Sequence, residues 1–206
     1  MKITTTLVEA TAKYVNGFFQ RQLNPGFTYH NSSHTAYVVN SVKKLCSAMK
    51  VKKHAKNILL IAAWFHDLGF TRQIEGHEQI GAQLADEFLK SNKINESDIA
   101  AVKSCILSTR YPQHPMTFLQ KIICDADLMY LGDRNFFKTS DGLRKEWELT
   151  RHVTYSDMEW YKLNLNFVSS HHFHTTYCMS SVEKKKDKNV KLIENKYELL
   201  RKEVKQ

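Results

Sequence analysis

Apolar residues recur every three or four positions along most of the chain, the spacing typical of amphipathic helices. One example is the set Val38, Val42, Leu45 and Met49, which falls on one face of a helix predicted to begin at Ser32 as its N-cap. The sequence has only 7 glycines and 3 prolines, so turn signals are few. The pattern therefore predicts an all-α fold arranged as a helical bundle.

The same periodicity predicts helices over most of the remaining sequence. Their expected ranges are 5–23, 32–49, 53–67, 77–91, 95–108, 117–131, 134–151 and 156–174. Gly69 and Gly132 are the expected stops of two of them. A final apolar stripe, from Val190 to Val204, predicts a helix that packs back on the body. No linker interrupts the pattern. The prediction is one domain over residues 1–206, with a core at about 27–132 and C-terminal helices at about 133–206 packed on it.

Charge and cysteine content narrow the class of protein. Thirty Lys and Arg against 21 Asp and Glu give a net charge of +9, which indicates an anionic partner or a solvated basic surface. The four cysteines form no C-x-x-C pair, so we expect reduced, buried thiols. The longest apolar run, "ILLIAAWF", is far shorter than a membrane span, and the N-terminus lacks the apolar core of a signal peptide. The sequence predicts a cytoplasmic protein with no membrane partner.

Four polar residues fall where the pattern predicts burial. They are His34, the adjacent His66 and Asp67 in "AAWFHDLGF", and Asp127 in "IICDADLMYLG". Burying an unpaired carboxylate costs several kcal/mol, so two of them require a partner. Two imidazoles and two carboxylates suit a divalent Mn, Fe, Co, Ni or Zn ion. The alternative is a pair of ordinary buried ion pairs or helix caps. Adjacent His66 and Asp67 can share one ion only if the backbone leaves the helix at "DLG".

The order of these residues resembles the HD-domain superfamily of metal-dependent phosphohydrolases. The resemblance covers at least residues 29–132, and the later helices resemble the C-terminal part of small bacterial proteins of this type. It implies a helical bundle with a metal site at its centre. His34, His66, Asp67 and Asp127 would be the ligands. The implied substrates are phosphate esters, often nucleotides.

The stretch "YHNSSH" is similar to a motif of the cyclic-nucleotide phosphodiesterases, which belong to the same superfamily. That similarity implies that His34 binds metal and that His30 protonates the leaving oxygen. His30 precedes His34 by one helical turn, and an imidazole can donate a proton near neutral pH. The alternative is that His30 packs at the start of the helix. Those phosphodiesterase domains are much larger than this chain, and no base-recognising glutamine is identifiable here, so the specificity stays open.

Other candidates lie around these residues. His77 and Glu78 could orient water or hold a second, labile ion such as Mg, although we expect one tightly held metal. Their alternative role is an ordinary first helical turn, where Glu is favourable. Arg72 and Arg110 could bind a phosphate group, or they could be solvated loop residues.

The sequence thus predicts a metal-dependent phosphohydrolase acting on a phosphorylated small molecule, with a nucleotide favoured. Asp67 would contact both metal and attacking water, and His30 would be the general acid. The alternative is a non-catalytic module that binds metal and nucleotide. Binding of nucleic acid is disfavoured, since the chain has no helix-turn-helix and no aromatic platform within a basic face. A homo-oligomer is compatible with the sequence.

Overall fold

The computed structural model describes residues 1–203, all of whose regular structure is helical. The α-helices are α1 (Thr5–Gln22), α2 (Ser32–Ala48), α3 (Lys53–Phe65), α4 (His77–Ser91), α5 (Glu96–Leu107), α6 (Phe118–Leu128), α7 (Phe136–Arg151), α8 (Asp157–Ser170), α9 (Thr176–Ser181) and α10 (Glu183–Glu203). Two 3₁₀ turns, η1 (Leu68–Thr71) and η2 (Met129–Gly132), follow α3 and α6. The chain divides into two compact units. The first joins residues 1–25 to 30–127, and the second joins 26–29 to the helices after residue 127.

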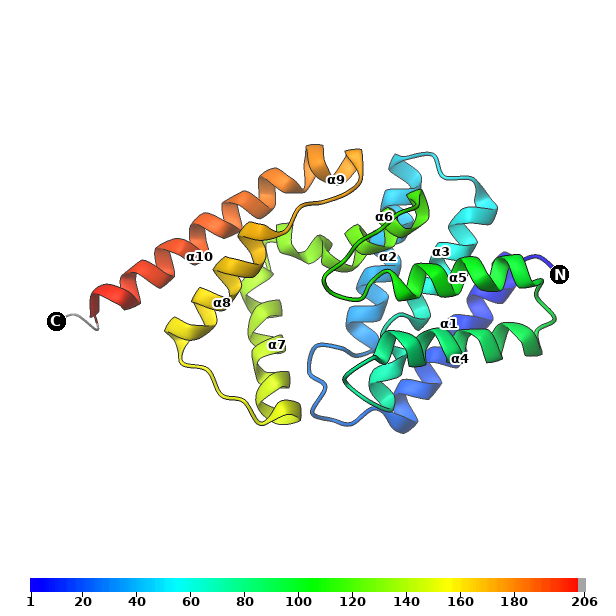
Figure 1. The fold of residues 1–206 in the computed structure, drawn as a ribbon, viewed down its shortest axis with the longest axis horizontal. Coiled ribbons are helices and arrows are strands. Elements are labelled where there is room, and N and C mark those ends of the chain that lie inside the picture. Colours follow the sequence, from blue (N-terminus) through cyan, green and yellow to red (C-terminus); the bar gives the residue numbers. More distant parts are fainter. Residues whose placement is uncertain (204–206) are drawn as a thin grey trace. The chain divides into compact units, whose positions relative to one another are not determined.

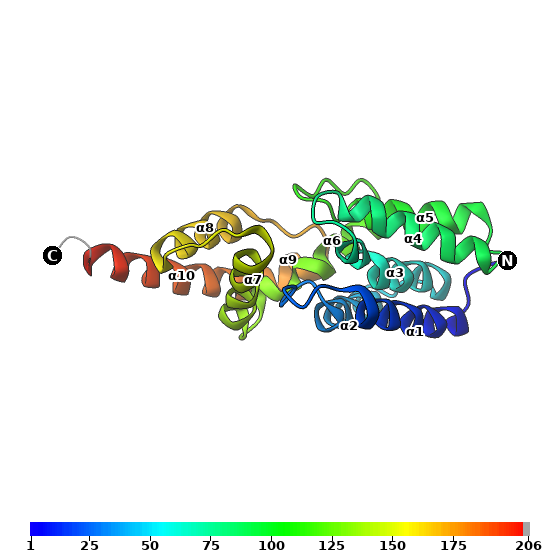
Figure 2. The same ribbon diagram turned by 90° about the horizontal axis from the view of Figure 1, so that it is seen from below.

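The first unit is built around α3. Residues 58–63 of this helix, "ILLIAA", are all buried, as expected for a helix that is apolar on every side. Figure 2 shows α3 between α1 and α2 on one side and α4 and α5 on the other. Each surrounding helix turns its own apolar stripe inward, for example Val38, Val42 and Leu45 of α2. This arrangement leaves the C-terminal end of α3 enclosed by its neighbours, which is where the polar residues "HD" occur.

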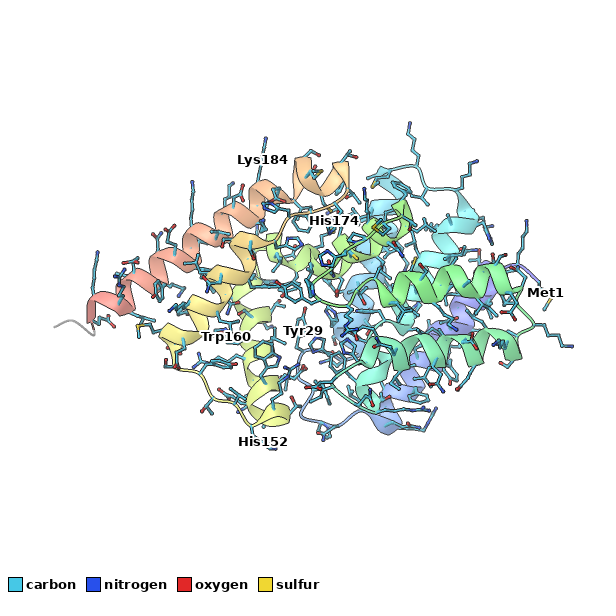
Figure 3. All side chains as sticks on the ribbon, in the orientation of Figure 1. Met1, Tyr29, His152, Trp160, His174 and Lys184 are labelled. Carbon is cyan, nitrogen blue, oxygen red and sulfur yellow. The ribbon has the colours of Figure 1, made fainter. Side chains whose placement is uncertain are left out.

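The second unit is organised by α8 and α10, which lie side by side in Figure 1 and are in contact. Ile193 of α10 is fully buried, and Val190, Tyr197 and Leu200 are half-buried on the same stripe. Trp160 extends from α8 toward α7 (Figure 3), where its indole N–H donates to Ser140 Oγ at 2.9 Å. Within this unit α10 packs on α8, and its packing on the core of the first unit stays a prediction. Val204 lies outside the described residues.

Most predicted helices are confirmed with differences at their ends, whereas α9 was not predicted. α4 has the predicted bounds, but α3 and α6 end earlier than expected, at Phe65 and Leu128. Each is followed by a 3₁₀ turn in place of a simple glycine stop, so Gly69 and Gly132 lie within these turns. The predicted cap of α2 is wrong. Asn31, whose backbone is extended, accepts the N–H groups of Ser33 and His34, and Ser32 is already helical.

Two further expectations can be compared with the structure. All four cysteines are buried and free of disulfides, as predicted. Burial raises the pKa of the Cys105 thiol to about 12, so the thiolate is strongly disfavoured. None of the helices in residues 1–203 combines the length and the apolar composition needed to cross a membrane.

Candidate metal centre

Three separate elements bring the four predicted polar residues together within the first unit. His34 lies in the first turn of α2, directly after the Asn31 cap. His66 follows the last residue of α3, and Asp67 comes next with φ −103° and ψ 2°, outside the helical region. Asp127 lies in the last turn of α6. The predicted departure from helix at "DLG" is confirmed, and it turns the Asp67 carboxylate toward the His66 ring.

The facing atoms of these residues form a tight cluster. His34 Nε2 lies 3.3 Å from Asp67 Oδ2 and 3.3 Å from Asp127 Oδ1. His66 Nε2 lies 3.1 Å from Asp67 Oδ2 and 3.6 Å from Asp127 Oδ1. His34, His66 and Asp127 can each offer an atom within 4.8 Å of the others, which suits a shared ion. Donors about 2.0–2.2 Å from one ion would lie about 2.8–3.6 Å apart in octahedral or tetrahedral arrangements. The measured separations fall in that range.

Hydrogen bonding leaves two of these atoms available for an ion. His66 Nδ1 donates to the carbonyl of Ala63 at 2.8 Å, so in the neutral ring the lone pair is on Nε2, inside the cluster. His66 Nε2 and Asp67 Oδ2 are both buried and face each other at 3.1 Å, yet neither makes a hydrogen bond of good geometry. Buried polar atoms are normally satisfied, and this pair is better explained by coordination than by an ordinary ion pair. The residues therefore fit a divalent metal ion.

The electrostatics of the cluster agree with its role as a cation site. Burial alone would lower the pKa of His34 and His66, but the carboxylates of Asp67 and Asp127 more than offset it and raise both. Burial opposes ionisation of Asp127 too, yet the facing imidazoles of His34 and His66 hold its pKa at about 2. Burial likewise opposes ionisation of Asp67, but the nearby charge of His66 lowers the pKa of this carboxyl strongly. Two buried carboxylates thus stay ionised, and a bound cation would neutralise them in place of protonated histidines.

His77 and Glu78 lie beside the cluster, at the start of α4. His77 Nδ1 donates to the carbonyl of Ile74 at 2.9 Å, and its Nε2 lies 3.6 Å from Asp67 Oδ1. Glu78 is buried, with Oε1 3.5 Å from His77 Nε2. The predicted proximity of both residues to the site is therefore observed. Arg72 and Arg110 are exposed on the flanking loops, and nothing in the structure tests their role.

Two glycines allow the "HD" turn to pack closely against α4. A Cβ on Gly69 would lie 2.0 Å from the carbonyl oxygen of His77, and one on Gly81 would lie 2.5 Å from that of Phe65. Neither backbone oxygen could move away without shifting a helix. The close approach is what places His77 next to Asp67.

Two residues at the site are not predicted by the sequence. Phe70 in η1 stacks on the imidazoles of both His30 and His77. The Gln113 side-chain amide donates to Asp127 Oδ2 at 3.4 Å. In the sequence, Phe70 looks like an ordinary buried apolar residue. Gln113 lies in the irregular stretch "TRYPQHP", where no helical periodicity indicates which way its side chain points. Only the fold reveals that they touch the cluster.

Comparison with known families identifies the region that holds the cluster. The family model described as "HD domain" matches residues 31–129, a range that contains His34, His66, Asp67 and Asp127. Residues 31–129 of the chain therefore match the HD-domain family. HD domains bind divalent metals and are mostly metal-dependent hydrolases, in agreement with the ligand-like geometry. A search of the curated proteins gave no match, and neither did a search of the solved structures.

Proposed function

We propose that this HD domain is a phosphohydrolase that cleaves a phosphate ester of a small molecule, with a nucleotide as the favoured substrate. The observation that carries the proposal is the buried cluster of His34, His66, Asp67 and Asp127, in which His66 Nε2 and Asp67 Oδ2 face each other at 3.1 Å without a hydrogen bond of good geometry. These four residues would hold a Mn, Fe, Co, Ni or Zn ion. Such an ion supplies a Lewis acid for phosphoryl oxygens and lowers the pKa of a coordinated water.

The two oxygens of Asp67 suit a double role in this reaction. Oδ2 lies within the cluster of ligand atoms, whereas Oδ1 faces His77 at 3.6 Å. One oxygen can therefore serve the ion while the other accepts a hydrogen bond from the attacking water. His77 and Glu78 would help to orient that water, or hold a second, labile ion such as Mg. Arg72 and Arg110 remain candidates for binding the phosphate group.

His30 would be the general acid. Its ring centroid lies 5.8 Å from that of His34, and its ring stacks on Phe70. An imidazole beside the metal site but outside the ligand set can donate a proton to the leaving oxygen.

A substrate panel tests the proposal. The unmutated protein, loaded with each of Mn, Fe, Co, Ni and Zn, would be given nucleoside monophosphates, cyclic nucleotides and nitrophenyl phosphate mono- and diesters. We expect release of phosphate or of the alcohol, dependent on the ion and absent in Asp127→Asn. Binding of metal and nucleotide with no turnover on any ester would instead indicate the non-catalytic module.

A further inference from the structure

Phe70 is shared by two histidines of the site. Its ring centroid lies 4.3 Å from that of His30 with an interplanar angle of 25°, and 3.8 Å from that of His77 with an angle of 22°. The Phe70 side chain is buried. Stacking of this kind stabilises the contact beyond burial alone and favours one plane for each partner ring. Phe70 thus limits the orientations open to both imidazoles.

The backbone around Phe70 fixes its place relative to the ligands. The Phe70 N–H donates to the carbonyl of Asp67 at 3.1 Å. The preceding residue, Gly69, packs its Cα against the His77 carbonyl so closely that no Cβ fits. A larger residue at 69 would push η1 away from α4 and break the stack on His77. Phe70 is therefore held in one place by Asp67 on one side and by α4 on the other.

Both imidazoles that stack on Phe70 also adjoin ligand residues. His30 meets His34 edge to face, and His77 Nε2 lies 3.6 Å from Asp67 Oδ1. We propose that Phe70 is a positioning residue: it holds the His30 imidazole in the orientation from which it protonates the leaving oxygen. The proposal rests on the proposed function. Its alternative is that Phe70 only fills the core behind the site.

The nature of the leaving group separates these two roles. An alkoxide needs a proton as it departs, whereas nitrophenolate leaves without one. A misplaced general acid therefore slows only the first kind of ester, and small displacements of catalytic groups are costly, on the order of 10²-fold per ångström. A merely structural defect, or loss of the ion, would slow both kinds alike.

The test compares Phe70→Leu with Phe88→Leu. Phe88 of α4 packs on Tyr14 at 4.8 Å and Phe65 at 5.6 Å, so the control removes an aromatic ring from the same unit and spares the ring stacked on His30 and His77. For each metal-loaded protein, kcat and KM are measured on an alkyl phosphate ester and on the matching nitrophenyl ester. We expect Phe70→Leu to lower kcat by roughly 10–100-fold on the alkyl ester and less than about twofold on the nitrophenyl ester. Phe88→Leu should change the ratio of the two rates little.

A spectroscopic measurement reports on the stack without turnover. Histidine ring protons that lie over the face of Phe70 resonate upfield, so their NMR signals, assigned with His30→Ala and His77→Ala, should move downfield in Phe70→Leu and stay in place in Phe88→Leu. Metal content should be unchanged. If Phe70→Leu proves too unstable to purify, Phe70→Met retains more volume and removes the same ring.

Each remaining outcome has one meaning. Equal losses on both esters, or loss of the ion, in Phe70→Leu would overturn the positioning role and leave the proposed function intact. If the unmutated protein hydrolyses neither ester, the proposed function fails and the positioning role fails with it. Unshifted histidine signals in Phe70→Leu would show that the stack does not form in solution and would also overturn the proposal.

Discussion

At the scale of single residues, the proposed function gives different tasks to chemically similar groups. His34 and His66 present Nε2 to both carboxylates, whereas His30 stacks on Phe70 outside the cluster. In this proposal the surroundings of each imidazole, rather than its identity, would separate a metal ligand from a proton donor. The candidate ligands could be predicted because a polar residue on an apolar face is conspicuous. The contacts of Phe70 could not be predicted, because the sequence does not show which side chains a buried apolar residue packs against.

His30→Ala tests that separation of tasks. Loss of a general acid should lower turnover by about 10²–10⁴-fold on alkoxide leaving groups, and much less on nitrophenyl esters. Metal content should match that of the unmutated protein, because His30 lies outside the ligand cluster. His114→Ala, which removes an exposed histidine of the same unit, should change neither quantity. Equal losses on both esters would exclude the acid role, and loss of metal would make His30 a ligand.

At the scale of secondary structure, the site depends on how closely η1 and α4 approach. Gly69 and Gly81 permit this contact, because any Cβ there would collide with the backbone of His77 or of Phe65. The sequence predicted the bounds of α4 well, since its caps and periodicity are local signals. It did not predict η1, because a 3₁₀ turn after α3 is selected by packing against α4, which local sequence does not encode. The Asn31 cap was missed for a different reason: Asn and Ser both suit a cap, and backbone geometry decides between them.

Substitution of these glycines should be costly. Gly69→Ala and Gly81→Ala should each lower the free energy of unfolding of the first unit by about 1–3 kcal/mol or more, because helix backbones must move apart. The control is Gly142→Ala in α7, where the nearest atom is 3.9 Å from the added Cβ; alanine there should be neutral or stabilising by about 0.5–1 kcal/mol. Urea unfolding followed by circular dichroism measures all three. Equal effects at Gly69 and Gly142 would contradict the close-packing argument.

At the scale of the whole molecule, the cluster links stability to pH. The pKa values of His34 and His66 are higher in the folded state than in the unfolded chain, where a histidine has a pKa of about 6.5. Protonation of the two histidines therefore stabilises the metal-free fold fully below about pH 6.5, and this stabilisation is lost as pH rises through their folded-state pKa values. The lowered values of Asp67 and Asp127 stabilise it above about pH 3.9, and that contribution is lost as pH falls toward about 2 for Asp127. The contribution of the cluster to the metal-free fold is therefore largest between about pH 4 and pH 6.5.

A bound ion should reverse the trend at higher pH. Histidine ligands must lose their protons to coordinate, so metal binding becomes tighter as pH rises. We expect the metal-free protein to unfold more easily at pH 8.5 than at about pH 6. The increase in stability on adding the ion should be larger at the higher pH. Asp127→Asn should abolish this increase. If the increase in stability on adding the ion were smaller at the higher pH, the assignment of His34 and His66 as ligands would be contradicted.

The central claim is that His34, His66, Asp67 and Asp127 hold one divalent ion, and elemental analysis of the protein purified without chelators tests it most directly. We predict a first-row transition metal at close to one ion per chain, strongly reduced in Asp67→Ala. Arg72→Ala, which changes an exposed residue at the end of the same turn, should keep full occupancy. A metal-free protein that also fails to bind Mn, Fe, Co, Ni or Zn would contradict the claim, as would full occupancy in Asp67→Ala.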